Sequence, residues 1–543
     1  MKKKKSNFIV QGGILAMAGI LSRIIGIARR FPMQHIFGDK GNGYYAAAYS
    51  VYSIMLIISC YSLPLAVSKA VSAKISKRQY KSAQRVFQCA MVFALLMGGV
   101  TFFVCEFLGD FLAEHVMEEP MGALALKVLG PALLTVSVMG VFRGYFQGLG
   151  TMMPTAVSQI LEQIFVLIGS IAGTYVLYNY GEKVGALLHN EDFAPAYGAA
   201  GASIGPVLGS VIGLLFLAFV YSLYRRGTRK RSAHDANGRT DSYLHIFKLI
   251  ILTIVPVLMS TTVYNISDVI DTKIFGSIMI QKGFGDVKTD IWGVYTGKYK
   301  VLVNVPIALA NAMCASIVPV LTQLMVRREY GRAREKIGQA MRFTMVVAFP
   351  SAVGLTVLAR PIVTLLFKGE VDMAVNMLHL GSVSVIFFAV STLTNGVLQG
   401  INRMRIPVRN AAVALFIHVV FLCVTLEMGM GINAVIFANI LFGAIVCVLN
   451  AMAIRKYLRY RQELVRTFII PAIASVVMGI VIGVLSMVLS KAGSMAIVSA
   501  GIGVGAIVYF VVLILLKGIN ERDLRSMPGG RKVLKIAKKF RLL

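Results

Sequence analysis

The sequence predicts an all-α polytopic membrane protein with about fourteen transmembrane helices. First, 57% of its 543 residues are hydrophobic and only 15% are charged, and its mean hydropathy is +0.74. Second, runs of about twenty apolar residues, the length that a helix needs to cross a bilayer, recur along the whole chain. Third, no long stretch alternates between polar and apolar residues, as the strands of a membrane β-barrel would.

Each predicted span follows one apolar run. In chain order the spans are 8–30, 44–73, 84–108, 122–148, 153–178, 197–224, 244–274, 293–325, 337–358, 374–400, 406–428, 432–454, 467–489 and 494–517. The first span begins shortly after the basic start MKKKK, a pattern that resembles a signal peptide. The run continues through Arg23 without a small-residue cleavage site, so we expect an uncleaved first span.

The first predicted span carries arginines, which are costly in hydrocarbon unless they face water or an anion. Arg23 and Arg29 are six residues apart, so a helix places them about 9 Å apart along its axis, where they flank one broad face. We expect both to line a cavity that receives an anionic group. Arg30 lies beside them. For Arg29 and Arg30, extension of the side chain to the membrane surface is the alternative.

The distribution of basic residues indicates the orientation of the chain. Of the 55 Lys and Arg residues, 39 fall in loops on the amino-terminal side of the predicted spans and 11 on the opposite side. Because basic loops stay on the cytoplasmic side, we expect both termini to be cytoplasmic and the protein to lie in the cytoplasmic membrane. The formal charge of +31 then reflects attraction to anionic lipids, and we expect no nucleic-acid partner.

The chain repeats itself at a spacing of about 250 residues. Residues 77–83 (KRQYKSA) are echoed by 327–333 (RREYGRA), and residues 144–148 (GYFQG) are echoed by 396–400 (GVLQG). Six spans separate the copies, so the two halves share one orientation about an axis along the membrane normal. We therefore expect two six-helix, pseudo-symmetric lobes facing a central cavity, at 1–242 and 243–462. Two further helices and a basic tail follow in 463–543.

Acidic residues within the spans are few. Asp268 and Asp271 lie one helical turn apart in the seventh span. They either bind Na⁺ or H⁺ as a coupling ion, or they have a structural role, in which they pair with Lys273 or cap the helix region. Glu162 is expected to pair with Arg143 across the short turn between the fourth and fifth spans.

The chain lacks the common motifs of enzymes that act on nucleotides or peptides. It contains no glycine-rich phosphate loop, no HExxH motif and no soluble domain large enough for ATP hydrolysis. Its six cysteines are scattered through apolar segments without a CxxC pair, so we expect no metal site and no disulfide framework. The sequence thus predicts a transporter and not an enzyme, with no cofactor other than a coupling ion.

Four sequence features together resemble one family. They are the first-span pattern 22–29 (SRIIGIAR), the segments 64–69 (PLAVSK) and 293–306 (GVYTGKYKVLVNVP), and the paired Gln-Gly motifs that each precede a proline. With the two lobes, they resemble the MOP exporter superfamily, and within it the SpoVB/YtgP group of polysaccharide-biosynthesis proteins, relatives of MurJ-type lipid II flippases. The resemblance implies that Arg23 and Arg29 bind a pyrophosphate, with Lys298 or Lys300 as a further cation.

The function that this resemblance implies is flipping of an undecaprenyl-pyrophosphate-linked glycan precursor, either lipid II or a related polysaccharide intermediate, by alternating access. The expected partners are this lipid-linked anionic glycan and membrane lipids. An alternative is a cation-coupled multidrug antiporter of the same superfamily, which needs acidic rather than basic residues in the first lobe. A third reading is a non-transporting scaffold of the envelope-synthesis machinery, in which the arginines anchor lipid headgroups.

Overall fold

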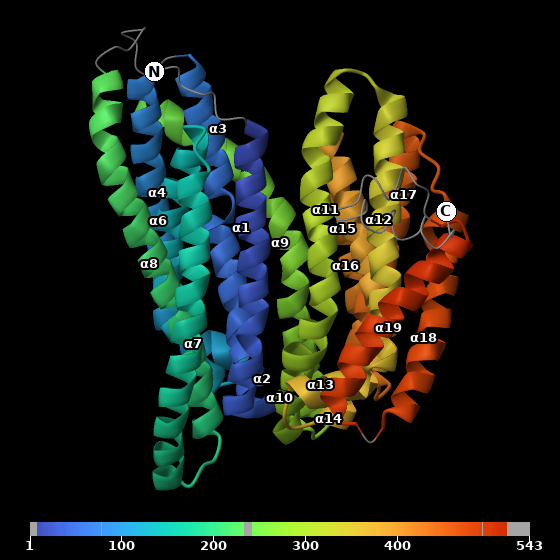
Figure 1. Ribbon diagram of the computed structural model, residues 1–543. Helices are drawn as coiled ribbons and strands as arrows, with labels where there is room; N and C mark the ends of the chain where they lie inside the picture. Colours follow the sequence, from blue (N-terminus) through green and yellow to red (C-terminus); the bar gives the residue numbers. More distant parts are fainter. Residues whose placement is uncertain (1–7, 78, 233–241, 491, 519–543) are drawn as a thin grey trace. The chain divides into compact units, whose positions relative to one another are not determined.

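The computed structural model describes residues 8–77, 79–232, 242–490 and 492–518, and every regular element in these ranges is a helix. The predicted all-α fold class is therefore confirmed. The chain divides into two compact units, 1–293 and 294–543 (Figure 1).

Eleven helices among the described residues are long and apolar enough to cross a membrane, or twelve if the bent pair α14 (Val371–Gly381) and α15 (Ser384–Gly400) is one span. The axes of this pair differ by 53°. The predicted count of fourteen is not confirmed. The other two predicted spans fall on α1 (Phe8–Ala28) and α9 (Tyr243–Gln281), whose apolar stretches in the described residues are shorter than 18 residues.

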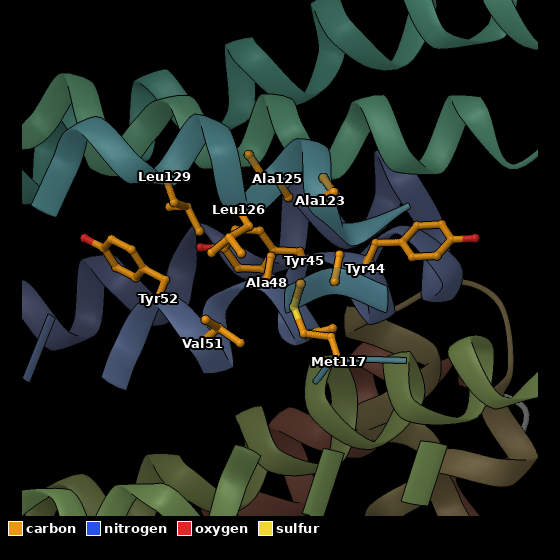
Figure 2. Close-up of a cluster of buried hydrophobic side chains, with 14 of the residues drawn as sticks. Tyr44, Tyr45, Ala48, Val51, Tyr52, Met117, Ala123, Ala125, Leu126 and Leu129 are labelled. Atoms are coloured by element: carbon orange, nitrogen blue, oxygen red, sulfur yellow. The ribbon is translucent and has the colours of Figure 1, made fainter. Parts of the chain in front are cut away.

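The first unit contains α1 to α10 and one π-helical turn. Besides α1 and α9, its elements are α2 (Arg30–Leu56), η1 (Ile57–Tyr61), α3 (Leu63–Ser76), α4 (Tyr80–Phe107), α5 (Gly109–His115), α6 (Gly122–Gly148), α7 (Met153–Leu188), α8 (Phe193–Ser232) and α10 (Gly285–Val294), of which the last residue belongs to the second unit. In one core cluster, Tyr45 and Tyr52 of α2 pack with Leu126 and Leu129 of α6 (Figure 2).

α1 and α2 form one nearly continuous helix that breaks at Gly38. The amide of Arg29 donates to the carbonyl of Ile25 (3.1 Å), and the amide of Met33 donates to the carbonyl of Arg29 (3.4 Å). Gly38 has φ +70° and ψ −167°, a conformation open mainly to glycine. The first span therefore continues to about residue 37, beyond the predicted end at 30. Arg29 lies about 12 Å from that end of the helix, since eight residues intervene.

α7 and α8 approach closely because glycines lie between them. A Cβ atom on Gly169 would lie 3.1 Å from the Cα of Gly205. A Cβ atom on Gly209 would lie 2.6 Å from the carbonyl oxygen of Glu162. Larger side chains at these positions would push the two helices apart. The short distance brings the side chain of Ser170 on α7 within reach of the α8 backbone.

α9 packs into the core of the first unit. Its residues Ile246, Ile250 and Ile254 are buried in one cluster with Leu63 and Val67 of α3. Packing therefore divides the chain at residue 293. The lobes 1–242 and 243–462 were inferred from the sequence repeat, and they stay a prediction about its two halves. The chain passes from one unit to the next inside a helix, since α10 continues without a gap into the π-helical turn η2 (Tyr295–Tyr299).

The second unit contains η2, the bent pair α14 and α15, and eight further elements. These are α11 (Lys300–Val326), α12 (Tyr330–Val357), α13 (Ala359–Leu366), α16 (Arg405–Glu427), α17 (Ile432–Leu458), η3 (Val465–Ile469), α18 (Ile470–Val488) and α19 (Ser494–Leu515). Met478 and Ile482 of α18 and Tyr509 of α19 are buried against Val346 of α12, so the last two helices are part of the core of this unit.

Candidate functional site

Of the three arginines predicted as site residues, Arg29 is the one that the first unit encloses most completely. It is only 9% exposed, although it carries a full positive charge at any physiological pH. Its Nη1 donates to the hydroxyl of Ser170 on α7 (3.1 Å) and its Nη2 to the hydroxyl of Tyr45 on α2 (3.5 Å). Its Nε is buried and has no acceptor among the described residues. Arg29 is thus held by two hydroxyl groups, and its Nε is the guanidinium nitrogen left without an acceptor among the described residues.

Ser170 links Arg29 to a third helix. Its hydroxyl is fully buried, accepts the bond from Arg29 and donates to the carbonyl oxygen of Ala202 on α8 (2.8 Å). The close packing of α7 on α8 makes this second bond possible. The position of the guanidinium is therefore set by α2, α7 and α8 together, which is the kind of support that preorganises a binding group.

A ladder of tyrosines runs along α2 next to the two adjacent arginines. The rings of Tyr45 and Tyr49 are 5.8 Å apart and those of Tyr49 and Tyr52 are 5.5 Å apart. Arg30 is close enough to Tyr45 and Tyr49 to interact with both electrostatically. The sequence analysis missed this ladder. The spacing of three tyrosines at i, i+4 and i+7, which places them on one helix face, could have revealed it.

Arg23 and Arg29 have different surroundings within the first unit. Arg23 is exposed, whereas Arg29 is buried. The residues on either side of Arg23 lie against α7, because Ser22 donates to the carbonyl of Gln159 (3.4 Å) and Gly26 faces Gln163. Within this unit Arg29 is therefore the arginine that the fold positions, and the expectation that both arginines line one cavity stays a prediction.

Arg143 and Glu162 form the ion pair that the sequence analysis expects. Arg143 Nη2 lies 2.7 Å from Glu162 Oε2, and Arg143 Nε donates to the hydroxyl of Ser158 (3.1 Å). Both side chains are mostly buried. This prediction is confirmed, and the charge of Glu162 is matched within the first unit by a residue of α6.

Lys298 and Lys300 lie at the start of the second unit and differ in burial. Lys298 is fully buried, and its Nζ donates to the carbonyl oxygen of Glu370 (3.0 Å). Lys300 is half-buried, with its Nζ 5.5 Å from the centre of the Tyr295 ring. Lys298 belongs to the π-helical turn η2, and such turns often occur at functional sites. Of the two ammonium groups, that of Lys300 is the more accessible.

Asp268 and Asp271 lie on α9, one exposed and one buried. Lys273, the partner suggested for them from the sequence, bonds instead to Glu118 and to the carbonyl oxygen of His115. In the part of the chain that the structure describes, no cluster of three or more His, Cys, Asp or Glu residues has the arrangement of a metal site.

Comparison with known protein families gives two matches. The model of a family described as "Polysaccharide biosynthesis protein" matches residues 10–325, and the model named MatE matches residues 301–424. Together these matches begin in the first span and reach into α16.

Two curated proteins of Bacillus subtilis are similar over most of the chain. The lipid II flippase MurJ is 25% identical over 486 residues, which cover 86% of each protein. The stage V sporulation protein B is 23% identical over 543 residues, which cover 98% of this chain and all of the relative.

Two solved structures share the fold. A lipid II flippase MurJ in an inward closed conformation has a TM-score of 0.65 and 16% identity, and covers 92% of this chain and 97% of its own. A multidrug resistance MATE family transporter in an inward-facing conformation has a TM-score of 0.59 and 16% identity, and covers 80% of this chain and 98% of its own. The MurJ and MATE proteins among these matches are transporters rather than enzymes.

Proposed function

The chain belongs to the polysaccharide biosynthesis protein family of the MOP superfamily, and from this premise we propose that it flips a lipid-linked anionic glycan across the cytoplasmic membrane. The substrate class is an undecaprenyl-pyrophosphate-linked precursor, such as lipid II or a related polysaccharide intermediate. Both termini are cytoplasmic in this proposal, as the excess of Lys and Arg on the amino-terminal side indicates.

The environment of Arg29 is the observation that carries the proposal. A buried guanidinium without a carboxylate partner is costly, and such a charge is usually retained because it meets an anion or a water-filled path. Arg29 contacts two hydroxyl groups, has no acceptor for its Nε among the described residues and has Arg30 next to it in the chain. A pyrophosphate oxygen satisfies such donors well, since guanidinium groups bind phosphate in a bidentate manner.

The remaining predicted residues have secondary roles in this proposal. Arg23 and Arg30 add positive charge along the first span, and Lys300 of the second unit neutralises the same headgroup in another stage of the cycle. Lys298 supports the fold around η2 through its bond to Glu370. Asp268 and Asp271 bind the coupling ion, Na⁺ or H⁺, and alternating access moves the headgroup while the lipid tail stays in the bilayer.

The multidrug antiporter is the second candidate, and the match of residues 301–424 to the MatE model favours its fold. Export of cationic drugs requires an acidic side chain that is free to receive them. Glu162, the acidic residue nearest in sequence to the α7 residues that support Arg29, is already paired with Arg143. The first unit therefore suits an anionic substrate better than a cationic one.

Binding of defined lipids to the purified protein tests the proposal. The parent should bind lipid II and undecaprenyl pyrophosphate more tightly than undecaprenyl phosphate. Arg29→Ala should weaken the binding of undecaprenyl pyrophosphate by about tenfold or more, because hydrogen bonds to charged groups contribute about 1.5–3 kcal/mol. Arg29→Lys should lie between the two, since it keeps the charge without the planar fork.

Arg360→Ala is the matched control, because Arg360 pairs with Asp372 at an exposed site on α13. It should bind undecaprenyl pyrophosphate as the parent does. Equal affinity of the parent and Arg29→Ala, at equal protein abundance in the membrane, would refute the assignment of Arg29. Tight binding without movement of the lipid in vesicles would favour the scaffold of the envelope-synthesis machinery over the flippase.

A further inference from the structure

Two adjacent glutamates connect the short segment 116–121 to α9 and α10. Glu118 accepts bonds from Lys273 and from the hydroxyl of Ser277 (3.0 Å), both on α9. Glu119 accepts bonds from Lys288 Nζ (2.5 Å) and from the hydroxyl of Thr289 (2.6 Å), both on α10. We call Glu118, Glu119, Lys273 and Lys288 the clasp. In the sequence, each glutamate lies more than 150 residues from the lysine that it binds.

The part of the clasp that contacts α10 is buried. Glu119 is 8% exposed, Lys288 7% and Thr289 4%. Lys288 also donates to the carbonyl oxygen of Glu118, so its ammonium is held by both residues of the segment. Removing either partner of such a buried pair destabilises the protein, because the charge that remains is uncompensated. The neighbouring Met117 is anchored in the apolar cluster of α2 and α6, which fixes the segment to the unit (Figure 2).

α2 holds α10 from another side. The side-chain amide of Asn42 donates to the carbonyl oxygen of Gly293 (2.9 Å). A Cβ atom on Gly43 would lie 2.8 Å from Cγ2 of Thr289, so the two helices touch where only glycine fits. α10 is therefore bound to the first unit by an ion pair, a side-chain bond and close backbone packing.

α10 also continues into the second unit. The helix runs from α10 through η2 into α11 without a gap, and the boundary between the units falls after Gly293. Movement of the second unit relative to the first must therefore bend this helix at η2 or pull α10 from the clasp. η2 is a π-helical turn, where helices commonly bend. The strength of the bonds in the clasp therefore determines how easily α10 separates from segment 116–121.

We propose that the clasp keeps α10 on the first unit while substrate is loaded and that it opens in each transport cycle. This inference rests on the proposed flippase function and deepens it by naming positioning residues, Glu119 and Lys288, that act on conformation rather than on the lipid.

The surroundings of Glu119 determine how the clasp responds to pH. Burial raises the pKa of Glu119, and Lys288 and Thr289 offset this only in part. For Glu118, burial is outweighed by the hydrogen bonds from Lys273 and Ser277, which lower the pKa of that carboxyl. The other charged or titratable groups around this end of α10 are Lys40 and Tyr44 of α2, Asp192 in the turn before α8 and Asp290 of α10. Glu119 is thus the first of the two glutamates to be protonated as the pH falls.

A reversible cross-link tests whether the clasp must open. The six native cysteines, all free, are replaced first, and Glu119→Cys with Thr289→Cys is joined by a short bis-methanethiosulfonate reagent. Cross-linking should abolish movement of undecaprenyl pyrophosphate in vesicles and leave its binding intact, and reductant should restore movement. Asp110→Cys with Lys127→Cys is the control, since this ion pair joins α5 to α6 and does not involve α10. Unchanged movement in the cross-linked 119–289 protein overturns the proposal.

A conformational measurement that needs no substrate separates this proposal from the proposed function. In the cysteine-free protein, Thr289→Cys reports exposure of the clasp through its rate of reaction with a water-soluble thiol reagent. Adding Glu119→Gln or Lys288→Gln should raise that rate by about tenfold or more, because each leaves a buried charge unpaired. Adding Asp110→Asn should not. If these rates are all equal, the clasp does not control α10. If they differ but no lipid moves, the flippase function fails and the clasp stands.

Discussion

Removing the hydroxyl of Ser170 tests whether the fold positions Arg29 as the contacts indicate. Side-chain hydrogen bonds between helices in membrane proteins contribute about 0.6 kcal/mol on average and up to about 1.7 kcal/mol. Ser170 makes two such bonds, and the donor of one is charged. Ser170→Ala should therefore lower the free energy of unfolding by about 1–3 kcal/mol.

Ser203→Ala is the matched control, because the same atom is removed from an equally buried serine. Its hydroxyl donates only to the carbonyl of Ala199 on its own helix (3.0 Å), so the loss should stay below about 0.5 kcal/mol. Unfolding is followed by titration with a denaturing detergent in mixed micelles. In an Arg29→Ala background, Ser170→Ala should cost about 1 kcal/mol less than in the parent. A coupling of zero between the two positions would show that Ser170 does not hold Arg29.

Three further outcomes are expected. Lys300→Ala should weaken binding of undecaprenyl pyrophosphate about fivefold, whereas Lys298→Met should lower thermal stability with little effect on affinity, since its Nζ is enclosed and bonded to a carbonyl. Gly205→Ala would place a methyl group 2.7 Å from the backbone nitrogen of Ser170, so it should destabilise the protein by about 1–3 kcal/mol, whereas Gly99→Ala, with open space around it, should be tolerated. Lowering the external pH should speed labelling of a cysteine at position 289 relative to an exposed cysteine at position 110, because protonation of Glu119, whose pKa burial raises, removes the charge that holds α10. The ratio of the two rates cancels the loss of reactive thiolate at low pH, and Glu119→Gln should abolish its pH dependence.

Hydrophobic patterning predicted the fold class correctly. It placed the end of the first span too early in the sequence, and this boundary matters for the site. The first span seemed to end at residue 30 because Arg29, Arg30, Gln34 and His35 lower the local hydropathy. The helix nevertheless continues to Gly38, and both Arg29 and Gln34 are buried within the first unit. Average hydropathy does not register polar residues that face the inside of a bundle, which are the ones that form a site.

Charge pairs could be predicted from the sequence where a short turn brings the two residues together. They could not be predicted where only the tertiary fold does so. Arg143 and Glu162 are joined by a short turn between two helices, and their pairing could be expected from spacing alone. The bonds of Glu118 to Lys273 and of Glu119 to Lys288 span more than 150 residues, so no local pattern indicates them. For the same reason the sequence offered Lys273 only as one possible partner of its near neighbours Asp268 and Asp271 and did not indicate Glu118.

The burial of α9 in the first unit has a consequence for biosynthesis. When the ribosome has completed residue 242, six predicted spans have been made, but the surface of α3 that Ile246, Ile250 and Ile254 will cover is still exposed. The amino-terminal repeat therefore cannot finish folding by itself and must wait for the first helix of the next repeat to be inserted. A fragment that ends at residue 242 should remain bound to membrane chaperones or proteases, and co-expression of the remaining chain should rescue it.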